Sequence, residues 1–218
     1  MRGFIDYLAD PFTRDVLFEL SIEHVLLTMV PVLLATVVGV GLGITAARVP
    51  FLRPPILNTT STFLTIPSLA LFGLFIPLVG IGYPPAIIPL AMYALLPIVR
   101  NTMAGLLGVD SAVSESARGM GLGGTRRLVR IELPLAWPVI LAGLRVSTQL
   151  VIGIAAIAAL VGGPGLGNEI ISGIRRIGSA GAIDNLIGGT LAIVVLAALF
   201  DLVYLGIGRL TIPRGLRD

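Results

Sequence analysis

The sequence contains no lysine and no cysteine, and it has a single histidine, His24. All fifteen basic residues are therefore arginine. A phosphate-binding loop of the GxxxxGK[ST] type depends on its lysine, so this chain does not carry its own P-loop ATPase site. Without cysteine the chain has no disulfide, thiolate metal site or cysteine nucleophile. A lone histidine does not make a metal site, and we expect His24 at the outer membrane interface.

Charge is also scarce. Charged residues make up 12% of the chain and hydrophobic residues 56%, whereas a soluble domain is about 25% charged. With a mean hydropathy of +0.99, the composition predicts an all-α, polytopic membrane protein with no room for a separate soluble domain. The net charge of +3 is modest and indicates topology rather than nucleic-acid binding. No catalytic constellation of side chains is found in the sequence, so we expect no catalytic centre in this chain and do not expect an enzyme.

Five apolar runs are long enough to cross ~30 Å of hydrocarbon as helices. They cover residues 25–47, 56–79, 86–107, 136–161 and 183–208. Pro31, Pro67 and Pro97 predict kinks in the first three of them.

The first 22 residues differ from the rest. They are rich in acidic residues and lack the basic start and early apolar run of a signal peptide, so we expect residues 1–22 to be retained, with a short amphipathic helix on the membrane surface. With the N-terminus outside, four arginines face outward: Arg2, Arg14, Arg175 and Arg176. Ten face the cytoplasm: Arg48, Arg53, Arg100, Arg118, Arg126, Arg127, Arg130, Arg209, Arg214 and Arg217. The positive-inside rule favours this orientation, with a membrane domain over 23–210 and a cytoplasmic tail over 211–218.

Residues 108–135 then form a charged, glycine-rich cytoplasmic loop. Its pattern predicts two short helices: Asp110 or Ser111 can cap the first, the glycines around Gly121 end it, and Thr125 can cap the second. Small residues recur every fourth position at Val113, Ala117 and Gly121, giving a face that another backbone can approach closely. An ordinary amphipathic loop is the alternative interpretation.

The segment "ESARGMGLGGTRRLVRIELP" resembles the cytoplasmic EAA loop of permease subunits in ATP-binding-cassette (ABC) importers. The residues that match the family pattern are Glu115, Ala117, Gly121, Ile131, Leu133 and Pro134, with Ser116 in place of the middle alanine. The resemblance implies a type I importer permease fold in which the first loop helix docks on a separate ATPase subunit. It assigns the ATPase coupling to Val113, Glu115, Ser116, Ala117, Gly119, Gly121 and Leu122. It assigns packing of the loop against the spans to Ile131, Leu133 and Pro134.

Most of the chain, roughly residues 24–210, is similar to the osmoprotectant branch of these permeases, which imports glycine betaine, choline or carnitine. The similar segments include "TIPSLALFGLFIPLVGIG" and "GGPGLGNEIISGI". The resemblance implies ABC ATPase partners that bind ATP and Mg, a second permease subunit, identical or different, an extracytoplasmic solute-binding protein, and a place among the lipids of the cell inner membrane. An amino-acid importer is the alternative, and a gradient-driven carrier or a channel is a further one.

Polar residues inside the spans are the remaining candidates for function. Arg145 and Asp201 fall at similar depth in the fourth and fifth spans, and we hypothesise that they pair; separate snorkelling to the interface is the alternative. Thr65, Ser68, Thr148 and Gln149 are candidates for lining a translocation path, with interhelical hydrogen bonding as the alternative role.

Overall fold

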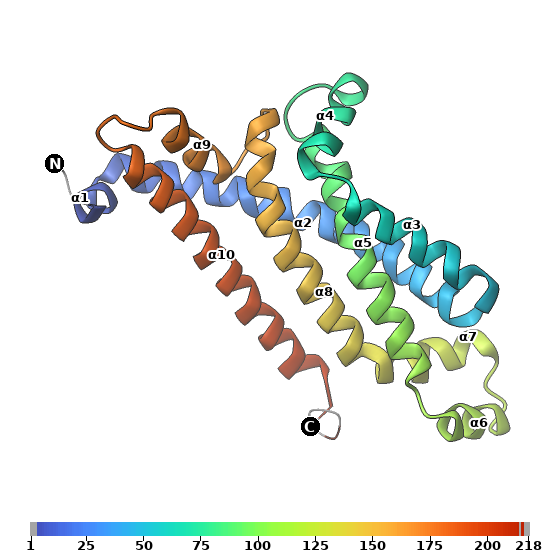
Figure 1. Ribbon diagram of the computed structural model, residues 1–218. Helices are drawn as coiled ribbons and strands as arrows, with labels where there is room; N and C mark the ends of the chain where they lie inside the picture. The colour runs from blue at the N-terminus through green and yellow to red at the C-terminus, as the bar shows by residue number, and fades with distance from the viewer. Residues whose placement is uncertain (1–3, 214, 216–218) are drawn as a thin grey trace.

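The computed structural model of the protein describes residues 4–213 and residue 215, and within them the chain is helical with no strand (Figure 1). Arg2, Arg214 and Arg217, used in the topology argument, lie outside the described residues, as does half of the predicted tail (residues 214 and 216–218). The helices in chain order are α1 (Phe4–Ala9), α2 (Pro11–Arg48), η1 (Pro50–Leu52), α3 (Arg53–Thr65), α4 (Ser68–Val79), α5 (Pro84–Leu107), α6 (Ser111–Gly119), α7 (Gly124–Arg127), η2 (Leu128–Glu132), α8 (Leu133–Ala155), η3 (Ala156–Val161), α9 (Gly167–Arg175) and α10 (Ala182–Thr211).

Four helical stretches are individually long and apolar enough to cross a membrane, and α3 with α4 makes a fifth when the two are counted together. The five predicted spans are therefore present, but the second is not straight: α3 and α4 meet at an angle of 97°. Ile66 and Pro67 adopt extended backbone at the break, and Pro67 has no N–H with which to continue a helix. The hydroxyl of Tyr93 on α5 donates to the freed carbonyl of Ile66 at 2.8 Å, which satisfies that group inside the bundle.

The first span is longer than predicted. α2 has 38 residues, or roughly 57 Å at ~1.5 Å per residue, so it exceeds the hydrocarbon thickness of a bilayer. Residues 11–22 continue this helix rather than lying on the membrane as a separate element, and only α1 is set off from it. α1 and the C-terminal end of α10 lie at opposite ends of the bundle (Figure 1), as an odd number of crossings requires.

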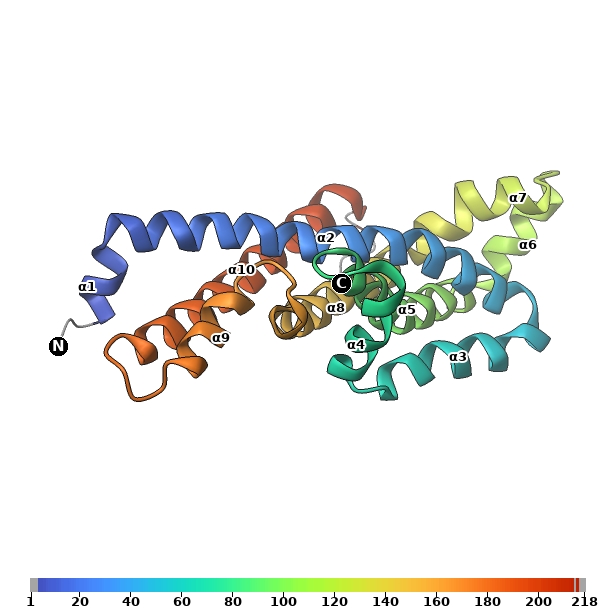
Figure 2. The same ribbon diagram turned by 90° about the horizontal axis from the view of Figure 1, so that it is seen from above.

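α2, α5 and α8 form the centre of the bundle and pack against one another over much of their length (Figure 2). Small residues allow this close approach: a Cβ added at Gly43 of α2 would lie 2.5 Å from Cβ of Thr102 on α5. Likewise, a Cβ added at Gly143 of α8 would lie 2.5 Å from Cβ of Asn101 and 2.9 Å from the carbonyl oxygen of Pro97. Helices in lipid associate through such packing, because burying apolar surface gives little gain there.

His24 is fully buried inside the protein, which the sequence did not predict. Its Nε2 lies 3.1 Å from the carbonyl oxygen of Ile152 on α8, and the glycine-rich turn at 162–167 covers it. Gly165, at a φ of +99°, approaches so closely that a Cβ would lie 2.9 Å from Nδ1 of His24. The N–H of Gly165 donates to the Glu23 carboxylate at 2.9 Å. These contacts hold the "GGPGLG" segment as an ordered turn against α2.

Candidate functional site

The charged loop forms a separate unit at one end of the bundle, made of α6, α7 and η2 (Figure 1). Asp110 caps α6, because its side chain accepts from the N–H of Ala112 at 2.8 Å, as the sequence predicted. Gly121 ends the helix in the left-handed conformation, with a φ of +82°. The N–H of Leu122 donates to the carbonyl of Ala117 and that of Gly121 to the carbonyl of Arg118. This is a Schellman motif with its glycine at the position that favours glycine most.

The residues predicted to couple to an ATPase lie on or directly after α6, and most of them face outward. Val113, Glu115, Ser116 and Gly119 are exposed, and so is Gly121. Ala117 is not: it is 1% exposed and faces the chain itself, while Leu122 is partly covered. The expectation of an open face through Val113, Ala117 and Gly121 is therefore wrong at its centre, because the chain folds back over Ala117 in the Schellman motif.

The second half of the loop differs from the predicted capped helix. Thr125 is not the cap; Gly123 occupies the N-cap position and has no side chain to supply a hydrogen bond. α7 is only four residues long and passes into a five-residue π-helix, η2, a rare form often found at functional sites. Of the three predicted packing residues, Leu133 packs against the core of the bundle, Ile131 is partly buried and Pro134 is exposed.

The structure also reveals a charged cluster that the sequence analysis did not find. Glu132 is 8% exposed, and its carboxylate accepts from two arginines. Arg127 Nε donates to Oε1 at 2.8 Å, and Arg48 Nη2 donates to Oε2. Arg48 lies at the end of α2, far from Glu132 in sequence, so no local spacing could have predicted the contact. The presence of a glutamate in the otherwise apolar I-x-L-P end of the loop was the available signal.

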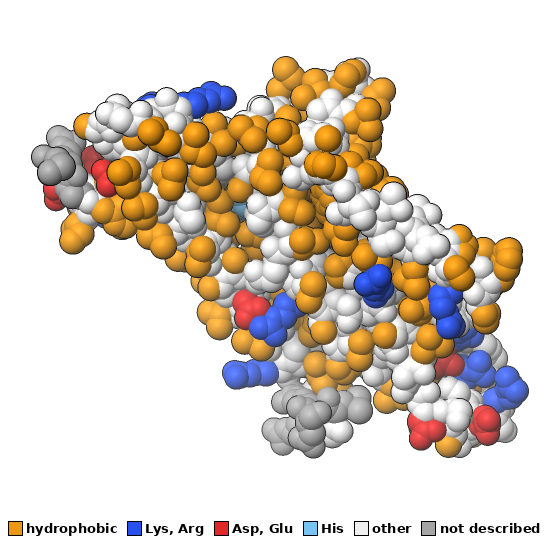
Figure 3. Space-filling view, viewed as in Figure 1, with side chains coloured by type: hydrophobic (Ala, Val, Ile, Leu, Met, Phe, Trp, Pro, Cys, Tyr) orange, Lys and Arg blue, Asp and Glu red, His pale blue; other side chains and the backbone are white. Residues whose placement is uncertain are grey.

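Arg145 and Asp201 form the ion pair that was hypothesised, joining α8 to α10. Arg145 Nη2 donates to Asp201 Oδ2 at 2.6 Å, and Arg145 Nε donates to Oδ1. This two-pronged geometry is typical of arginine with a carboxylate. The side chains of the pair are 42% and 32% exposed, and the surface of the molecule seen in Figure 3 is largely hydrophobic. Elsewhere in that view the charged side chains gather mainly over α6 and α7.

Two of the four predicted path residues, Thr148 and Gln149, make hydrogen bonds between helices. The Thr148 hydroxyl is buried; it donates to the carbonyl of Leu144 and lies 2.7 Å from the hydroxyl of Tyr204 on α10. Gln149 donates to the carbonyl of Ala197 at 2.9 Å and lines a groove of about 750 Å³ between α8 and α10, together with Arg145 and Tyr204. Thr65 is exposed and Ser68 partly exposed at the break between α3 and α4. The structure does not bring these two near Thr148 and Gln149 in a common hydrogen-bond network of the described residues.

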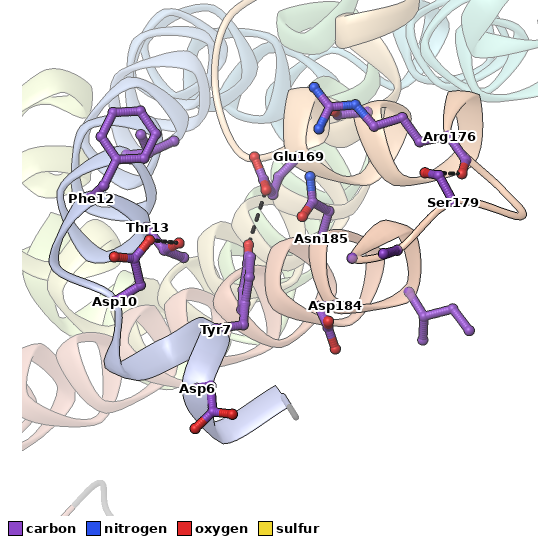
Figure 4. Close-up of a pocket in the computed structure, with 15 residues that line it drawn as sticks. Asp6, Tyr7, Asp10, Phe12, Thr13, Glu169, Arg176, Ser179, Asp184 and Asn185 are labelled. Carbon is purple, nitrogen blue, oxygen red and sulfur yellow. Dashed lines mark hydrogen bonds between the residues drawn. The ribbon is translucent and has the colours of Figure 1, made fainter. Parts of the chain in front are cut away.

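A second cavity, also of about 750 Å³, lies at the opposite end between α1, the start of α2, α9 and α10 (Figure 4). Tyr7 of α1 donates to the Glu169 carboxylate of α9 at 2.9 Å, and burial together with this hydrogen bond raises the pKa of Tyr7. The Tyr7 ring also sits against Gly188 of α10, where a Cβ would lie 2.6 Å away. Acidic side chains outnumber basic ones in the lining, which includes Asp6, Asp10, Glu169, Asp184 and Arg176.

No group of three or more potential metal ligands occurs among the residues that the structure describes.

Comparison with known proteins gives a consistent result. Residues 39–215 match the family model of the binding-protein-dependent transport system inner membrane component. The osmoprotectant import permease protein OsmW of Salmonella typhimurium is 39% identical over 98% of this chain and 99% of its own. The glycine betaine/carnitine/choline transport system permease protein OpuCB of Bacillus subtilis is 37% identical over 89% of this chain and 88% of its own.

A solved chain of the MetNI methionine ABC transporter, in an inward-facing conformation, has the same fold. It superimposes with a TM-score of 0.81 over 94% of this chain and all of its own, at 22% sequence identity. The family model covers well over half of the chain and the relatives match nearly end to end. The chain therefore belongs to the family of binding-protein-dependent transport system inner membrane components.

Proposed function

We propose that this chain is the transmembrane permease subunit of an ATP-driven ABC importer for quaternary ammonium osmoprotectants such as glycine betaine, choline or carnitine. The observation that carries the proposal is the exposed helix α6, ended by Gly121 in a Schellman motif at one end of the bundle, in a chain whose relatives are named as permeases for these solutes. A helix that projects from the bundle with outward-facing side chains is suited to dock on a partner.

In the proposed mechanism the loop end is cytoplasmic and the N-terminal end is outside. This chain has no lysine for a phosphate-binding loop, so ATP and Mg are bound by two separate ATPase subunits. These two subunits close against each other when ATP binds. Their closure moves α6, and the loop carries this movement into the membrane helices. Two permease subunits enclose the path and alternate between inward-open and outward-open states.

The acidic cavity at the outer end is part of the surface on which the proposed solute-binding protein would sit. Selectivity resides largely in that protein, since a quaternary ammonium head is best held over aromatic faces and aromatic residues are only 6% of this chain. The permease needs a path that admits the solute rather than a tight site for it.

Reconstitution tests the proposal. The chain would be incorporated into proteoliposomes with its ATPase and the solute-binding protein, and uptake of radiolabelled glycine betaine would be followed. We expect uptake that requires ATP inside the vesicles and no ion gradient. Uptake that persists without the ATPase, driven by an ion gradient or by the solute gradient alone, would assign the chain to carriers or channels. ATP-dependent uptake of an amino acid instead of glycine betaine would show that the chain is an ABC importer permease for a different solute.

A pair of matched variants tests the role of the loop. Gly121→Asp places a side chain at a φ of +82°, whereas Gly123→Asp adds the same charge two residues later at ordinary extended backbone. We expect the Gly121→Asp variant to insert into the membrane and its complex to hydrolyse ATP without solute uptake. The complex with Gly123→Asp should take up solute normally. Normal transport by Gly121→Asp would remove this coupling mechanism.

A further inference from the structure

The buried carboxylate of Glu132 lies where the charged loop meets the membrane helices. It is the last residue of the π-helix η2, and α8 begins at the next residue. An ionised carboxylate that is 8% exposed is costly unless it is paired. Each of its two oxygens accepts from a different arginine, so both the charge and the hydrogen-bonding capacity of the carboxylate are met.

The two arginines differ in where they come from. Arg127 is five residues before Glu132 on the same loop, so that contact holds the loop to itself. Arg48 is the last residue of α2, and it is 84 residues away in sequence. Among the hydrogen bonds between described residues, Arg48–Glu132 is the one that joins α2 to residues 108–132.

The loop has few other connections to the bundle. α6 packs mainly against α7, and the loop continues covalently into α5 on one side and α8 on the other. α2 has no covalent connection to the loop, yet it lies along both α5 and α8 in the core. A movement of α6 therefore reaches α5 and α8 through the chain itself, but it needs a contact to reach α2 directly.

We propose that the Arg48–Glu132 contact is a mechanical junction that makes α2 move together with the coupling loop, and that Glu132 is a positioning residue for transport. This inference rests on the proposed function, because it concerns how ATPase movement is transmitted. Arg48 ties the carboxylate to α2, whereas Arg127 donates to it from within the loop and makes no connection to α2. Without the tie, movement of the loop reaches α2 only indirectly, through its packing against α5 and α8.

Three arginine variants separate transmission from simple stabilisation. Arg48→Gln removes the tie to α2; Arg127→Gln removes one guanidinium from the same carboxylate but leaves the tie. Arg130→Gln removes an exposed arginine of the same loop and serves as the control. In the reconstituted importer we expect Arg48→Gln to lower solute uptake per ATP hydrolysed on the order of tenfold, within the usual range of coupling between sites. Arg127→Gln and Arg130→Gln should stay within about twofold of wild type.

Glu132→Gln breaks the same contact from the other side while keeping the side-chain shape, so it is the second variant if Arg48→Gln inserts poorly. Glu132→Gln should lower solute uptake per ATP hydrolysed as much as Arg48→Gln does. Equal losses in Arg48→Gln and Arg127→Gln, or wild-type coupling in both Arg48→Gln and Glu132→Gln, would overturn the junction. A wild-type complex that shows no ATP-dependent uptake at all would instead overturn the proposed function, so the two failures are distinguishable.

A distance measurement tests the junction without measuring transport. The chain has no cysteine, so spin labels can be attached at Val49→Cys, next to Arg48, and at Met120→Cys, at the end of α6; both positions are exposed. In the complex with its ATPase we expect the distance between the labels to stay the same on ATP binding, because the two elements move together. In Arg48→Gln it should change and its distribution broaden. A distance that changes equally in both proteins would show independent movement and overturn the proposal.

Discussion

Glycine has different structural roles in the helix bundle and in the charged loop. In the bundle, Gly43 and Gly143 are needed for space, since a Cβ at either would lie 2.5 Å from a neighbouring Cβ. In the loop, a Cβ at Gly121 or Gly123 would meet nothing within 4 Å. Gly121 is needed for its backbone conformation instead, with a φ of +82°. The same residue type thus allows close helix packing in the bundle and a left-handed helix end in the loop.

This difference explains how one chain can contain both a rigid part and a movable part. Interlocked helices with no spare volume transmit a displacement rather than absorbing it. The loop has open space around its glycines and contacts the bundle at few places, so it can shift as a unit at low cost. Substitutions at crowded and at open glycines, and at left-handed and at extended ones, test this difference between the two regions.

The largest effect is expected at a tight contact between two helices of the bundle. Gly143→Ala forces α8 away from the backbone of α5, because the carbonyl oxygen of Pro97 lies 2.9 Å from the new Cβ. We expect a loss of about 3 kcal/mol of stability, the upper part of the range for overpacking. Gly153→Ala on the same helix has open space and should be neutral. Thermal denaturation in detergent, followed by size-exclusion chromatography, measures both; equal stabilities would show that the bundle is not interlocked.

The Arg145–Asp201 pair tests how α8 holds α10. Asp201→Ala leaves Arg145 without its partner on an apolar face, and we expect a loss of roughly 2 kcal/mol. This is below the ~2.5–3.5 kcal/mol cost of a charge at the centre of a membrane helix, because the Arg145 side chain is 42% exposed. The exchange Arg145→Asp with Asp201→Arg should recover part of the loss. A double variant no better than the single ones would refute stabilisation by pairing.

In the loop, the cost of replacing a glycine should depend on the backbone conformation and not on the space around it. Gly121→Ala has room for its methyl group but needs a left-handed backbone, so we expect a local cost of about 1 kcal/mol. Gly123→Ala lies at an extended φ of −64° and ψ of 158° and should cost less. Hydrogen–deuterium exchange of the α6 amides reports the difference, and faster exchange in Gly123→Ala than in Gly121→Ala would reverse the assignment.

The smallest effect is expected at the start of α6. Asp110→Ala removes the acceptor for the N–H of Ala112, and an exposed cap of this kind contributes about 0.5–1 kcal/mol. Asp110→Asn keeps an oxygen acceptor and should retain most of the protection. The exchange rate of the Ala112 amide measures this directly; an unchanged rate in Asp110→Ala would show that the cap contributes nothing.

Local chemistry was readable from the sequence, and contacts between distant segments were not. Asp110 and Gly121 could be assigned because a cap and a helix end depend on neighbouring residues. The Arg145–Asp201 pair could be hypothesised because two rare charges fall at similar depth in apolar runs. Glu132 stood out as a charge in an apolar segment, but nothing in the sequence identified Arg48 as its partner, since depth and spacing do not specify which loop touches which helix end.

The errors have physical reasons as well. The burial of His24 was not predicted: the turn around Gly165 covers it, and the Ile152 carbonyl oxygen lies 3.1 Å from its Nε2. Thr125 was expected to cap a second helix, yet the chain there passes directly into a π-helix that continues into α8. The predicted kink at Pro67 is confirmed, but the donor that satisfies the Ile66 carbonyl at the bend, Tyr93, lies 27 residues further along the chain and was not predicted.

That last contact bears on how the protein is made. The carbonyl of Ile66 finds its donor only on α5, which leaves the ribosome after α3 and α4. The bent pair therefore cannot reach its final arrangement as an isolated insertion step; it must wait, partly satisfied by water or by the insertion machinery, until the following helix arrives. Biogenesis of this half of the molecule is thus a joint event of three helices, and a chain truncated before Tyr93 should leave the pair accessible to degradation.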